Sequence, residues 1–270
     1  MVNLRMINRD LGDCSGMLEE GLLIEGINDP YIFKVLFTAG GPGSGKSFVA
    51  DHTVKGLGLK YVASDIIFEK YLKKAGLSLK LGKVGSPLHD KQWKVRTHAK
   101  EKTGKREVGW VNGMLGLVVD GTGKSYSKIT KHAKMLKANG YDVGMLFVNT
   151  SLKTSLERNA ARERSIDEKP VREMWNQVHN NLGKFQKFFG NSDFFIIDSN
   201  KTYKGADIET FGVGLRRLGL KWLSQPVKNP LGKEIIAQLK ATGGKTLSDF
   251  RQATQIAASK NQGFINSITG

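Results

Sequence analysis

Five short apolar runs, rich in β-branched and aromatic residues, recur along the chain, and turn residues follow each of them. Runs of this length and composition predict buried strands rather than helices. They cover residues 31–38, 59–63, 114–119, 142–148 and 193–198. Most of their positions are apolar without strict alternation, which is typical of strands that are covered on both faces.

Amphipathic segments separate these runs and predict helices over residues 45–55, 65–75, 89–110, 125–138, 151–164 and 170–189. Ser151 is placed as an N-cap, and Asn139-Gly140 is a plausible helix stop. Strands that alternate with helices predict a three-layer α/β/α fold around a five-stranded parallel sheet. Ligands of such sheets bind beyond the carboxyl ends of the strands, so the residues there carry the most functional weight.

The pattern divides the chain into three parts. Residues 1–30 predict a short helical extension, and 31–225 hold the alternating strands and helices. Pro226 and Pro230 then mark a boundary. We expect residues 226–270 to form a small, mainly helical and basic C-terminal extension, with six Lys and Arg against two acidic residues.

The charge balance indicates more about possible binding partners than the overall composition does. The chain of 270 residues contains 42 Lys and Arg against 25 Asp and Glu, a net charge of +17 that attracts polyanions. A single cysteine, Cys14, excludes an internal disulfide. The polar start is unlike a signal peptide, and no apolar run approaches the ~20 residues that span a bilayer, so we expect a cytoplasmic protein without membrane contact.

The strongest motif lies between the first predicted strand and the first predicted helix. Residues 40–47 read GGPGSGKS and match G-x-x-x-x-G-K-[ST], the phosphate-binding P-loop. In such a loop backbone N–H groups surround the phosphates, the lysine reaches the β- and γ-phosphates, and the last hydroxyl binds Mg²⁺. The predicted cofactors are therefore ATP and Mg²⁺, held by Gly41, Pro42, Gly43, Ser44, Gly45, Lys46, Ser47 and Phe48. The alternative is a glycine-rich turn with a chance lysine.

Other residues favour transfer of the phosphoryl group over hydrolysis. Asp120 ends the third strand but precedes Gly121, whereas motor ATPases usually carry a second acid there. No N-K-x-D motif of a switch GTPase occurs. Asp65 follows the second strand, where a carboxylate can accept the proton of an attacking hydroxyl. The alternative is that Asp65 only caps the next helix.

The combination of GGPGSGKS, Ser64-Asp65, VVDGTG and FVNTSLKTSLERNAARER resembles the small P-loop kinases of the zeta-toxin and polynucleotide-kinase group, and more closely bacteriophage zeta-toxin-like kinases. The resemblance covers about residues 31–200 and implies a P-loop NTPase fold. It implies that Asp65 is the general base and that Lys46 and Ser47 hold phosphate and magnesium. It further implies that Asp120 lies near the metal or acceptor and that 198–201, including Asn200, lies near adenine.

A lid over the triphosphate is also implied, formed by Arg158, Arg162 and Arg164. Without the family, Arg158 and Arg162 are four residues apart and share a face of the predicted helix 151–164. Arginines over a transferring phosphoryl group stabilise its charge. The alternative is a solvated basic face, helped by Glu157 and Glu163.

The acceptor is suggested by the segment that follows Asp65. Residues 70–106 contain twelve Lys and Arg against two acidic residues, a net +10. Aromatic and imidazole side chains lie among these cations, which suits a nucleic-acid backbone with a stacked or flipped base. The expected acceptor contacts are Asp65, Trp93, Arg96, Arg106, Asp120 and Thr122. The alternatives are a solvated charged face with Trp93 and Trp110 in the core, or a small anionic substrate.

Three functions remain open at this point. The first is a kinase acting on nucleic acid, with DNA favoured, at a 5′-hydroxyl or at a hydroxymethylated pyrimidine of phage DNA, in the host cytoplasm. The second is a small-molecule kinase that phosphorylates UDP-N-acetylglucosamine, as zeta toxins do, or a nucleotide. The third, of another class, is an ATP-regulated nucleic-acid binding protein without phosphoryl transfer.

Overall fold

The fold is built on a parallel sheet. The computed structural model describes residues 29–162, 166–201, 203, 205–244 and 247–269, so the predicted extension 1–30 lies almost wholly outside the described residues. In this part of the chain five strands pair in the order β2-β3-β1-β4-β5, and every pairing is parallel. Their bounds are β1 Lys34–Ala39, β2 Lys60–Val62, β3 Leu117–Asp120, β4 Asp142–Asn149 and β5 Phe194–Asp198. The predicted α/β class and parallel sheet are confirmed.

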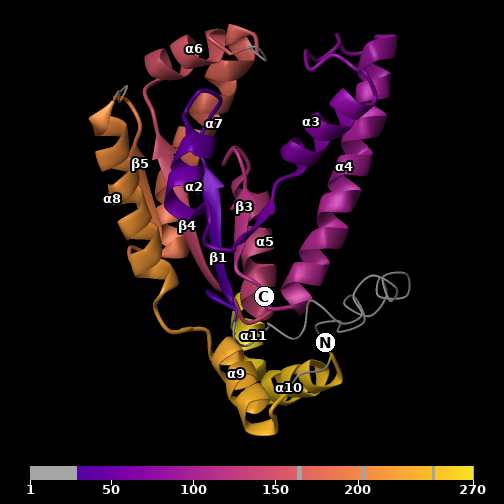
Figure 1. Cartoon of the computed structure of the whole chain (residues 1–270), viewed down its shortest axis with the longest axis vertical. Helices are drawn as coiled ribbons and strands as arrows, with labels where there is room; N and C mark the ends of the chain where they lie inside the picture. The colour runs from indigo at the N-terminus through magenta and orange to yellow at the C-terminus, as the bar shows by residue number, and fades with distance from the viewer. Residues whose placement is uncertain (1–28, 163–165, 202, 204, 245–246, 270) are drawn as a thin grey trace.

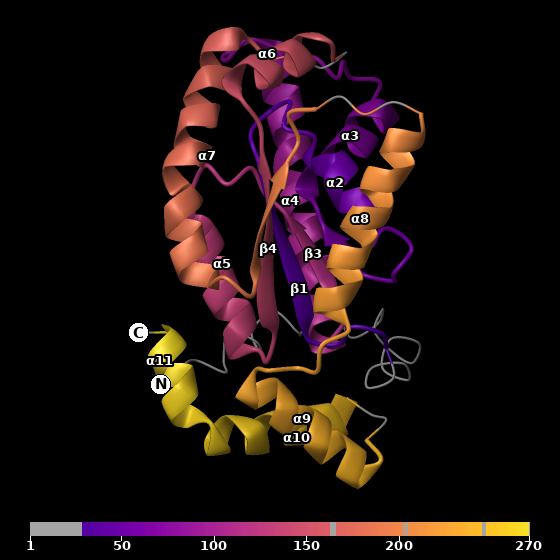
Figure 2. The ribbon, with the colours of Figure 1, turned by 90° about the vertical axis from the view of Figure 1, so that its left-hand side faces the viewer.

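Helices cover both faces of the sheet (Figures 1 and 2). α2 (Lys46–Val54) and α8 (Ala206–Leu223) pack together on one face, and α5 (Tyr126–Ala138) and α7 (Glu168–Phe189) cover the other. α3 (Ser64–Lys74) and α4 (Pro87–Asn112) form an arm beside β2, and α6 (Leu152–Ala160) crosses the end of the sheet where the strands finish. At the opposite end lie α9 (Pro230–Thr242), α10 (Leu247–Lys260) and α11 (Gln262–Thr269).

Backbone turns explain why two strands begin later than predicted. Tyr31 and Phe33 have positive φ angles of 66° and 54°, so the apolar run from 31 enters a turn before β1 starts at Lys34. Met114 has a φ of 59°, and β3 starts only at Leu117. Buried side chains in these turns imitate the composition of a strand, because the turns pack into the core.

The sheet separates two apolar layers. The larger layer joins Phe37, Leu117 and Phe147 to Val178 and Phe185 of α7. On the other face, Leu36, Val118 and Leu146 pack with Trp222 of α8. Adjacent strand residues alternate between these layers, as the two-residue repeat of a strand requires. The sheet is therefore a rigid base for the residues at its carboxyl edge.

The C-terminal helices are joined to the far edge of the sheet by polar contacts. The carboxylate of Asp142, at the start of β4, accepts hydrogen bonds from Lys34 Nζ at 2.7 Å and from the backbone N–H groups of Lys228 and Asn229, both at 2.8 Å. The Asn229 side chain caps α9 by accepting from Leu231 N at 3.0 Å. Leu231, Ile235 and Ala257 belong to the same apolar cluster as the sheet.

Among the helices described by the structure, none is long and apolar enough to cross a membrane.

Candidate active site

The carboxyl ends of the strands bring the predicted site residues to one edge of the sheet. β1 lies between β3 and β4, with Thr38 in register with Asp120, and Asn149 at the end of β4 in register with Asp198 of β5. The P-loop follows β1 at the centre of this edge (Figure 1). Side chains far apart in the sequence therefore meet around the loop.

The loop has the backbone of a phosphate cradle. Gly43 and Gly45 have φ angles of 75° and 86°, and a Cβ at Gly43 would lie 2.3 Å from Ser155 O. Among the described residues, no side chain caps the N-terminus of α2, whose N-cap is Gly45. Ser44 Oγ is buried and has no hydrogen-bond partner in the described part of the chain. Uncapped N–H groups and a free hydroxyl fit an anion at this helix end.

Lys46 and Asp120 meet directly beyond β1 and β3. The distance from Lys46 Nζ to Asp120 Oδ1 is 3.8 Å, and Thr38 Oγ1 donates to the same oxygen at 2.8 Å. The loop itself is fixed to the segment after β3, because Gly40 N donates to Thr122 O at 3.0 Å. Thr122 thus contributes its backbone here, and its predicted contact with the acceptor stays a prediction.

The donors present also fit a magnesium ion. The exposed hydroxyl of Ser47 follows Lys46, and Asp120 supplies a carboxylate that Thr38 orients. Mg²⁺ binds through one or two protein oxygens together with substrate phosphates and water. Among the described residues no group of three or more His, Cys, Asp and Glu side chains forms a closed metal site. Ser47 and Asp120 would therefore hold the ion jointly with the triphosphate.

Asp65 lies in the first turn of α3, directly after β2. Its side chain is 56% exposed, and its Oδ1 lies 3.6 Å from Nη2 of Arg96 in α4. The guanidinium also lies 5.4 Å from the ring centroid of Phe68. The N-cap residue of α3 is Ala63, so Asp65, two residues later, lies within the first turn and is not the cap residue. Its carboxylate is oriented by a cation and open to a ligand.

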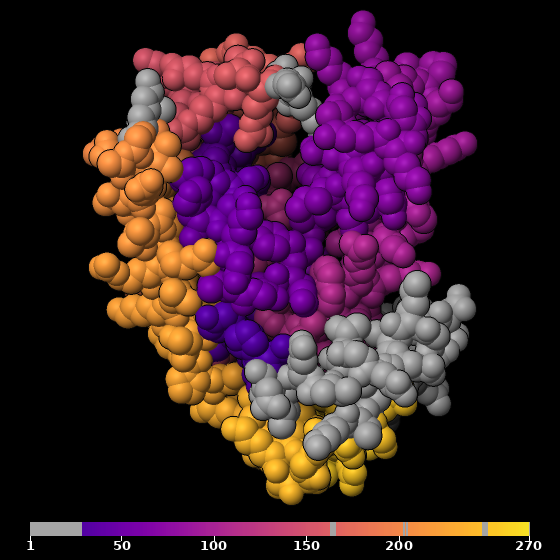
Figure 3. Space-filling view, viewed as in Figure 1, coloured from indigo at the N-terminus to yellow at the C-terminus, as the bar shows by residue number. Residues whose placement is uncertain are grey.

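The arm of α3 and α4 has its own small core of Phe68, Leu72 and Ala99, with Ile67, Tyr71 and Val95 packed around it. The surface is hollowed between this arm and the P-loop with α2 (Figure 3). Near the end of α4, Glu107 hydrogen-bonds His132 of α5, which shows which face of α4 is turned toward the body. We call the hollow between the arm and the P-loop the acceptor cleft.

Trp93 lies on the same face of α4 as Glu107. Trp93, Lys100 and Glu107 are spaced by seven residues, or two helical turns, so their side chains form one stripe. Trp93 is 56% exposed, and Lys100 Nζ lies 5.9 Å from its ring centroid. Trp93 is therefore not a core residue. Trp110, by contrast, is partly buried and packs against the main core.

The predicted arginine lid is only partly described. Arg158 Nη1 donates to Ser199 Oγ and its Nη2 to Lys201 O, both at 3.1 Å, which places the guanidinium beside the start of α2. The prediction that Arg158 and Arg162 share a helix face is wrong, because α6 ends at Ala160. The Asn159 side chain ties Ile166 back to the helix end, because its Nδ2 donates to Ile166 O at 2.6 Å and its Oδ1 accepts from Ile166 N at 3.2 Å.

Arg162 lies exposed in the turn after α6, and Arg164 lies outside the described residues. Arg106 is exposed on α4, at the part of the arm nearest its attachment to β3. Asn200 follows β5, and its Oδ1 accepts from Ser151 N at 2.7 Å. Roles of these residues toward a ligand stay predictions.

Three aromatic residues at this edge, Phe211, Tyr203 and Trp175, were not predicted as site residues. Phe48, which was predicted to contact ATP, stacks on Phe211 of α8 at 6.2 Å, and Phe211 stacks on Tyr203 at 4.3 Å. This aromatic row lies next to Arg158 and the P-loop, where a base could stack. Trp175 of α7 donates its Nε1 to Thr150 O at 2.7 Å and lies behind Gly41. From sequence alone, aromatic residues such as these are most simply interpreted as core residues. Only the tertiary structure shows that they lie at this edge of the sheet.

Burial raises the pKa of Tyr61 on β2 to about 12, with the charge of Asp51 as the next cause. Arg216 opposes this rise, and Asp120 adds to it. The phenol therefore stays neutral at physiological pH, close to the negative charge at the end of β3. It adds no charge to the site.

Comparison with known proteins supports the fold. A family model described as AAA domain matches residues 35–184, more than half of the chain. No curated protein sequence matches. The solved structure of AvrRxo1-ORF1:AvrRxo1-ORF2 with sulphate ions is 14% identical, covers 94% of this chain and 85% of that chain, and gives a TM-score of 0.50. At this identity the likeness concerns the fold alone.

Two other structures are more distant in shape. The PezAT chromosomal toxin–antitoxin system of Streptococcus pneumoniae is 14% identical, with 81% of this chain and 94% of that chain covered and a TM-score of 0.49. A gluconokinase from Sinorhizobium meliloti 1021 is 14% identical, with 73% and 95% covered and a TM-score of 0.40.

Proposed function

This chain belongs to the AAA domain family, and from its P-loop and strand ends we propose that it is an ATP-dependent phosphotransferase with a hydroxyl acceptor. One observation carries this proposal: an exposed carboxylate, Asp65, is held by Arg96 at the rim of the acceptor cleft, two strands away from the P-loop. Such a group has no evident role in packing the sheet. It suits a base that receives a proton from the acceptor.

In the proposed reaction, the P-loop N–H groups and Lys46 bind the β- and γ-phosphates of ATP. Asp65 accepts the acceptor's hydroxyl proton while that oxygen attacks the γ-phosphorus. The bond between the γ-phosphorus and the bridging oxygen breaks, and ADP leaves with the electron pair. Magnesium, held by Ser47 and Asp120, would neutralise part of the phosphate charge. Arg158 and Arg162 are the proposed lid cations.

Nucleic acid is the proposed acceptor class, with DNA favoured. The support is Trp93, an exposed indole on the same stripe of α4 as Glu107, together with Lys100 over its ring and Arg96, the partner of Asp65, one turn further along α4. An aromatic platform flanked by cations binds a base and its phosphates. The hydroxyl would be a 5′ end or a hydroxymethyl group on a pyrimidine.

The test is transfer of γ-labelled phosphate from ATP with Mg²⁺ to three acceptors in parallel. These are DNA with 5′-hydroxyl ends, including duplex that contains hydroxymethyluracil, a set of nucleoside monophosphates, and UDP-N-acetylglucosamine. Label in DNA supports the proposal. Label in a small molecule alone would replace nucleic acid by that acceptor, and no labelled product with any acceptor would favour an ATP-regulated binding protein.

Replacing Trp93 by alanine is expected to raise KM for the DNA acceptor about tenfold, because base–aromatic stacking contributes about 1–3 kcal/mol. Trp93→Phe should retain most of the affinity, since it keeps an aromatic face. Val108→Ala, on the same helix and also exposed, is the matched control and should leave KM unchanged. Steady-state kinetics with varied DNA check this, and an unaltered KM for Trp93→Ala would remove Trp93 from the acceptor site.

A further inference from the structure

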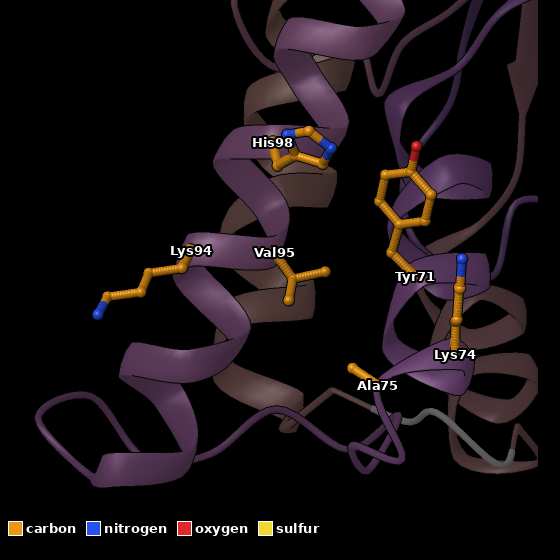
Figure 4. A pocket seen from close by; sticks show the side chains of 6 residues that line it. All are labelled: Tyr71, Lys74, Ala75, Lys94, Val95 and His98. Atoms are coloured by element: carbon orange, nitrogen blue, oxygen red, sulfur yellow. The ribbon is translucent and has the colours of Figure 1, made fainter.

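A second hollow lies in the arm, between the last turns of α3 and the middle of α4. Its volume is about 500 Å³, within the range of ligand sites, and it is lined by Tyr71, Lys74, Ala75, Lys94, Val95 and His98 (Figure 4). We call it the arm groove. None of these lining residues is among the acceptor contacts that the sequence suggests.

The arm groove and the acceptor cleft lie on different faces of α4. The helix buries Gln92, Ala99 and Thr103 on one stripe, toward α3 and the loop before α4. At 100° per residue, Trp93 and Lys100 lie on one side of this stripe, and Val95 and His98 lie on the other. Because Glu107 turns the Trp93 side toward the body, the arm groove is directed away from the cleft.

The groove combines a stacked aromatic pair with two cations. The rings of Tyr71 and His98 lie 5.4 Å apart with 26° between their planes, and Val95 and Ala75 form an apolar floor. Lys74 on α3 and Lys94 on α4 are both exposed, and in Figure 4 the Lys94 side chain extends from the side of α4 that is turned away from α3. Among the described residues that line the groove, none is acidic. This chemistry matches a flat heterocycle that carries negative charge, which is a nucleotide.

The two lysines, one on each helix, distinguish a strand from a free nucleotide. A nucleotide within a strand has phosphates at both the 5′ and the 3′ oxygen of its sugar, whereas a mononucleotide carries phosphate at one of them only. Resting on the proposed function, we infer that the arm groove binds a nucleotide of a single-stranded acceptor, remote from the reacting hydroxyl. The strand would pass around α4, which is about 10–12 Å across with its side chains.

This placement predicts a dependence on acceptor length. A dinucleotide fills the acceptor cleft without reaching the arm groove, whereas an oligonucleotide of about twelve nucleotides, within the usual size of single-strand sites, occupies both. The groove therefore lowers KM for long acceptors and leaves kcat unchanged, because its residues do not touch the reacting atoms.

The test variant is Lys74→Ala/Lys94→Ala/His98→Ala; all three side chains are exposed, so we expect the fold to be preserved. Its control is Lys221→Ala/Lys233→Ala, two exposed lysines away from the arm. We expect the triple variant to raise KM for the long acceptor about tenfold, with kcat and the dinucleotide KM unchanged. The fluorescence anisotropy of a labelled single strand, without ATP, should show a salt slope reduced by about 1.4, the value for two phosphate contacts.

Two results would overturn the inference. In the first, the triple variant binds the single strand with the same affinity as the lysine control. In the second, free UMP displaces the strand and binds as tightly as the strand does. Failure of the proposed function looks different. In that case no nucleic acid receives phosphate, while the difference in strand binding between the triple variant and the control persists.

Discussion

Replacing Asp65 by asparagine is expected to lower kcat for phosphoryl transfer about 10³-fold, within the usual contribution of general-base catalysis. Asparagine keeps the size and hydrogen bonding of the side chain but cannot accept the acceptor's proton. KM for ATP should stay within about twofold, because Asp65 lies outside the P-loop. Steady-state rates with the acceptor identified by the labelling assay provide the measurement.

A matched control separates catalysis from helix stabilisation. Asp65 and Asp207 are both exposed carboxylates in the first turn of a helix, α3 and α8 respectively. Both interact with the helix dipole, so Asp207→Asn should change thermal stability as little as Asp65→Asn does and leave kcat intact. Wild-type turnover by Asp65→Asn would show that Asp65 serves only the start of α3.

Lys46→Ala gives a contrasting pattern. The lysine lies 3.8 Å from Asp120 at the P-loop, so its loss should weaken ATP binding as well as turnover. ATP affinity measured by calorimetry then distinguishes the two variants, with a normal Kd for Asp65→Asn and a raised Kd for Lys46→Ala. Equal loss of ATP affinity in both would contradict the separate roles proposed for them.

The strands and the P-loop were predictable because their signals are local. Composition with turn residues located all five strands, and the spacing of glycines with Lys46 identified the loop between β1 and α2. Strand starts were less accurate, since apolar residues in a buried turn look like strand residues. The helix predicted to reach residue 164 ends at Ala160, where the Asn159 side chain donates to Ile166 O beyond the helix, a contact that the local pattern does not show.

The helix α8 was not predicted, and its glycines explain why. Gly212 and Gly219 lower helix propensity, yet each allows close packing on α2. A Cβ at Gly212 would lie 2.7 Å from His52 Cδ2, and one at Gly219 would lie 2.6 Å from Thr53 Cγ2. Only the packed structure shows this requirement. The ion pair of Asp65 with Arg96 is similarly nonlocal, because the partners come from different helices.

The largest expected effect on stability concerns the opposite end of the sheet. Asp142→Ala should lower the free energy of unfolding by about 3–5 kcal/mol, because it leaves a buried ammonium without its partner. Lys34 is 2% exposed and Asp142 9%, and their charged atoms lie 2.7 Å apart. For a chain of this size the loss corresponds to a Tm lower by about 10 °C, measurable by thermal unfolding.

Two further variants test the cause. Lys34→Met/Asp142→Leu removes both charges, so it should lose less stability than Asp142→Ala, although the N–H groups of Lys228 and Asn229 also lose their acceptor. Arg172→Ala breaks the exposed pair with Glu168 and should cost less than about 1 kcal/mol. A loss of unfolding free energy of less than about 1 kcal/mol for Asp142→Ala would contradict a structural role for the buried pair.

The Asp142→Ala variant also tests how the C-terminal extension is joined to the rest of the chain. Asp142 links β4 to the segment before α9, and Leu231 and Ile235 of α9 pack into the core under the sheet. If α9–α11 unfold together with the sheet, Asp142→Ala shifts a single cooperative transition. If residues 226–270 form a separate unit, limited proteolysis should cut them from Asp142→Ala first, while ATP affinity at the distant P-loop stays normal.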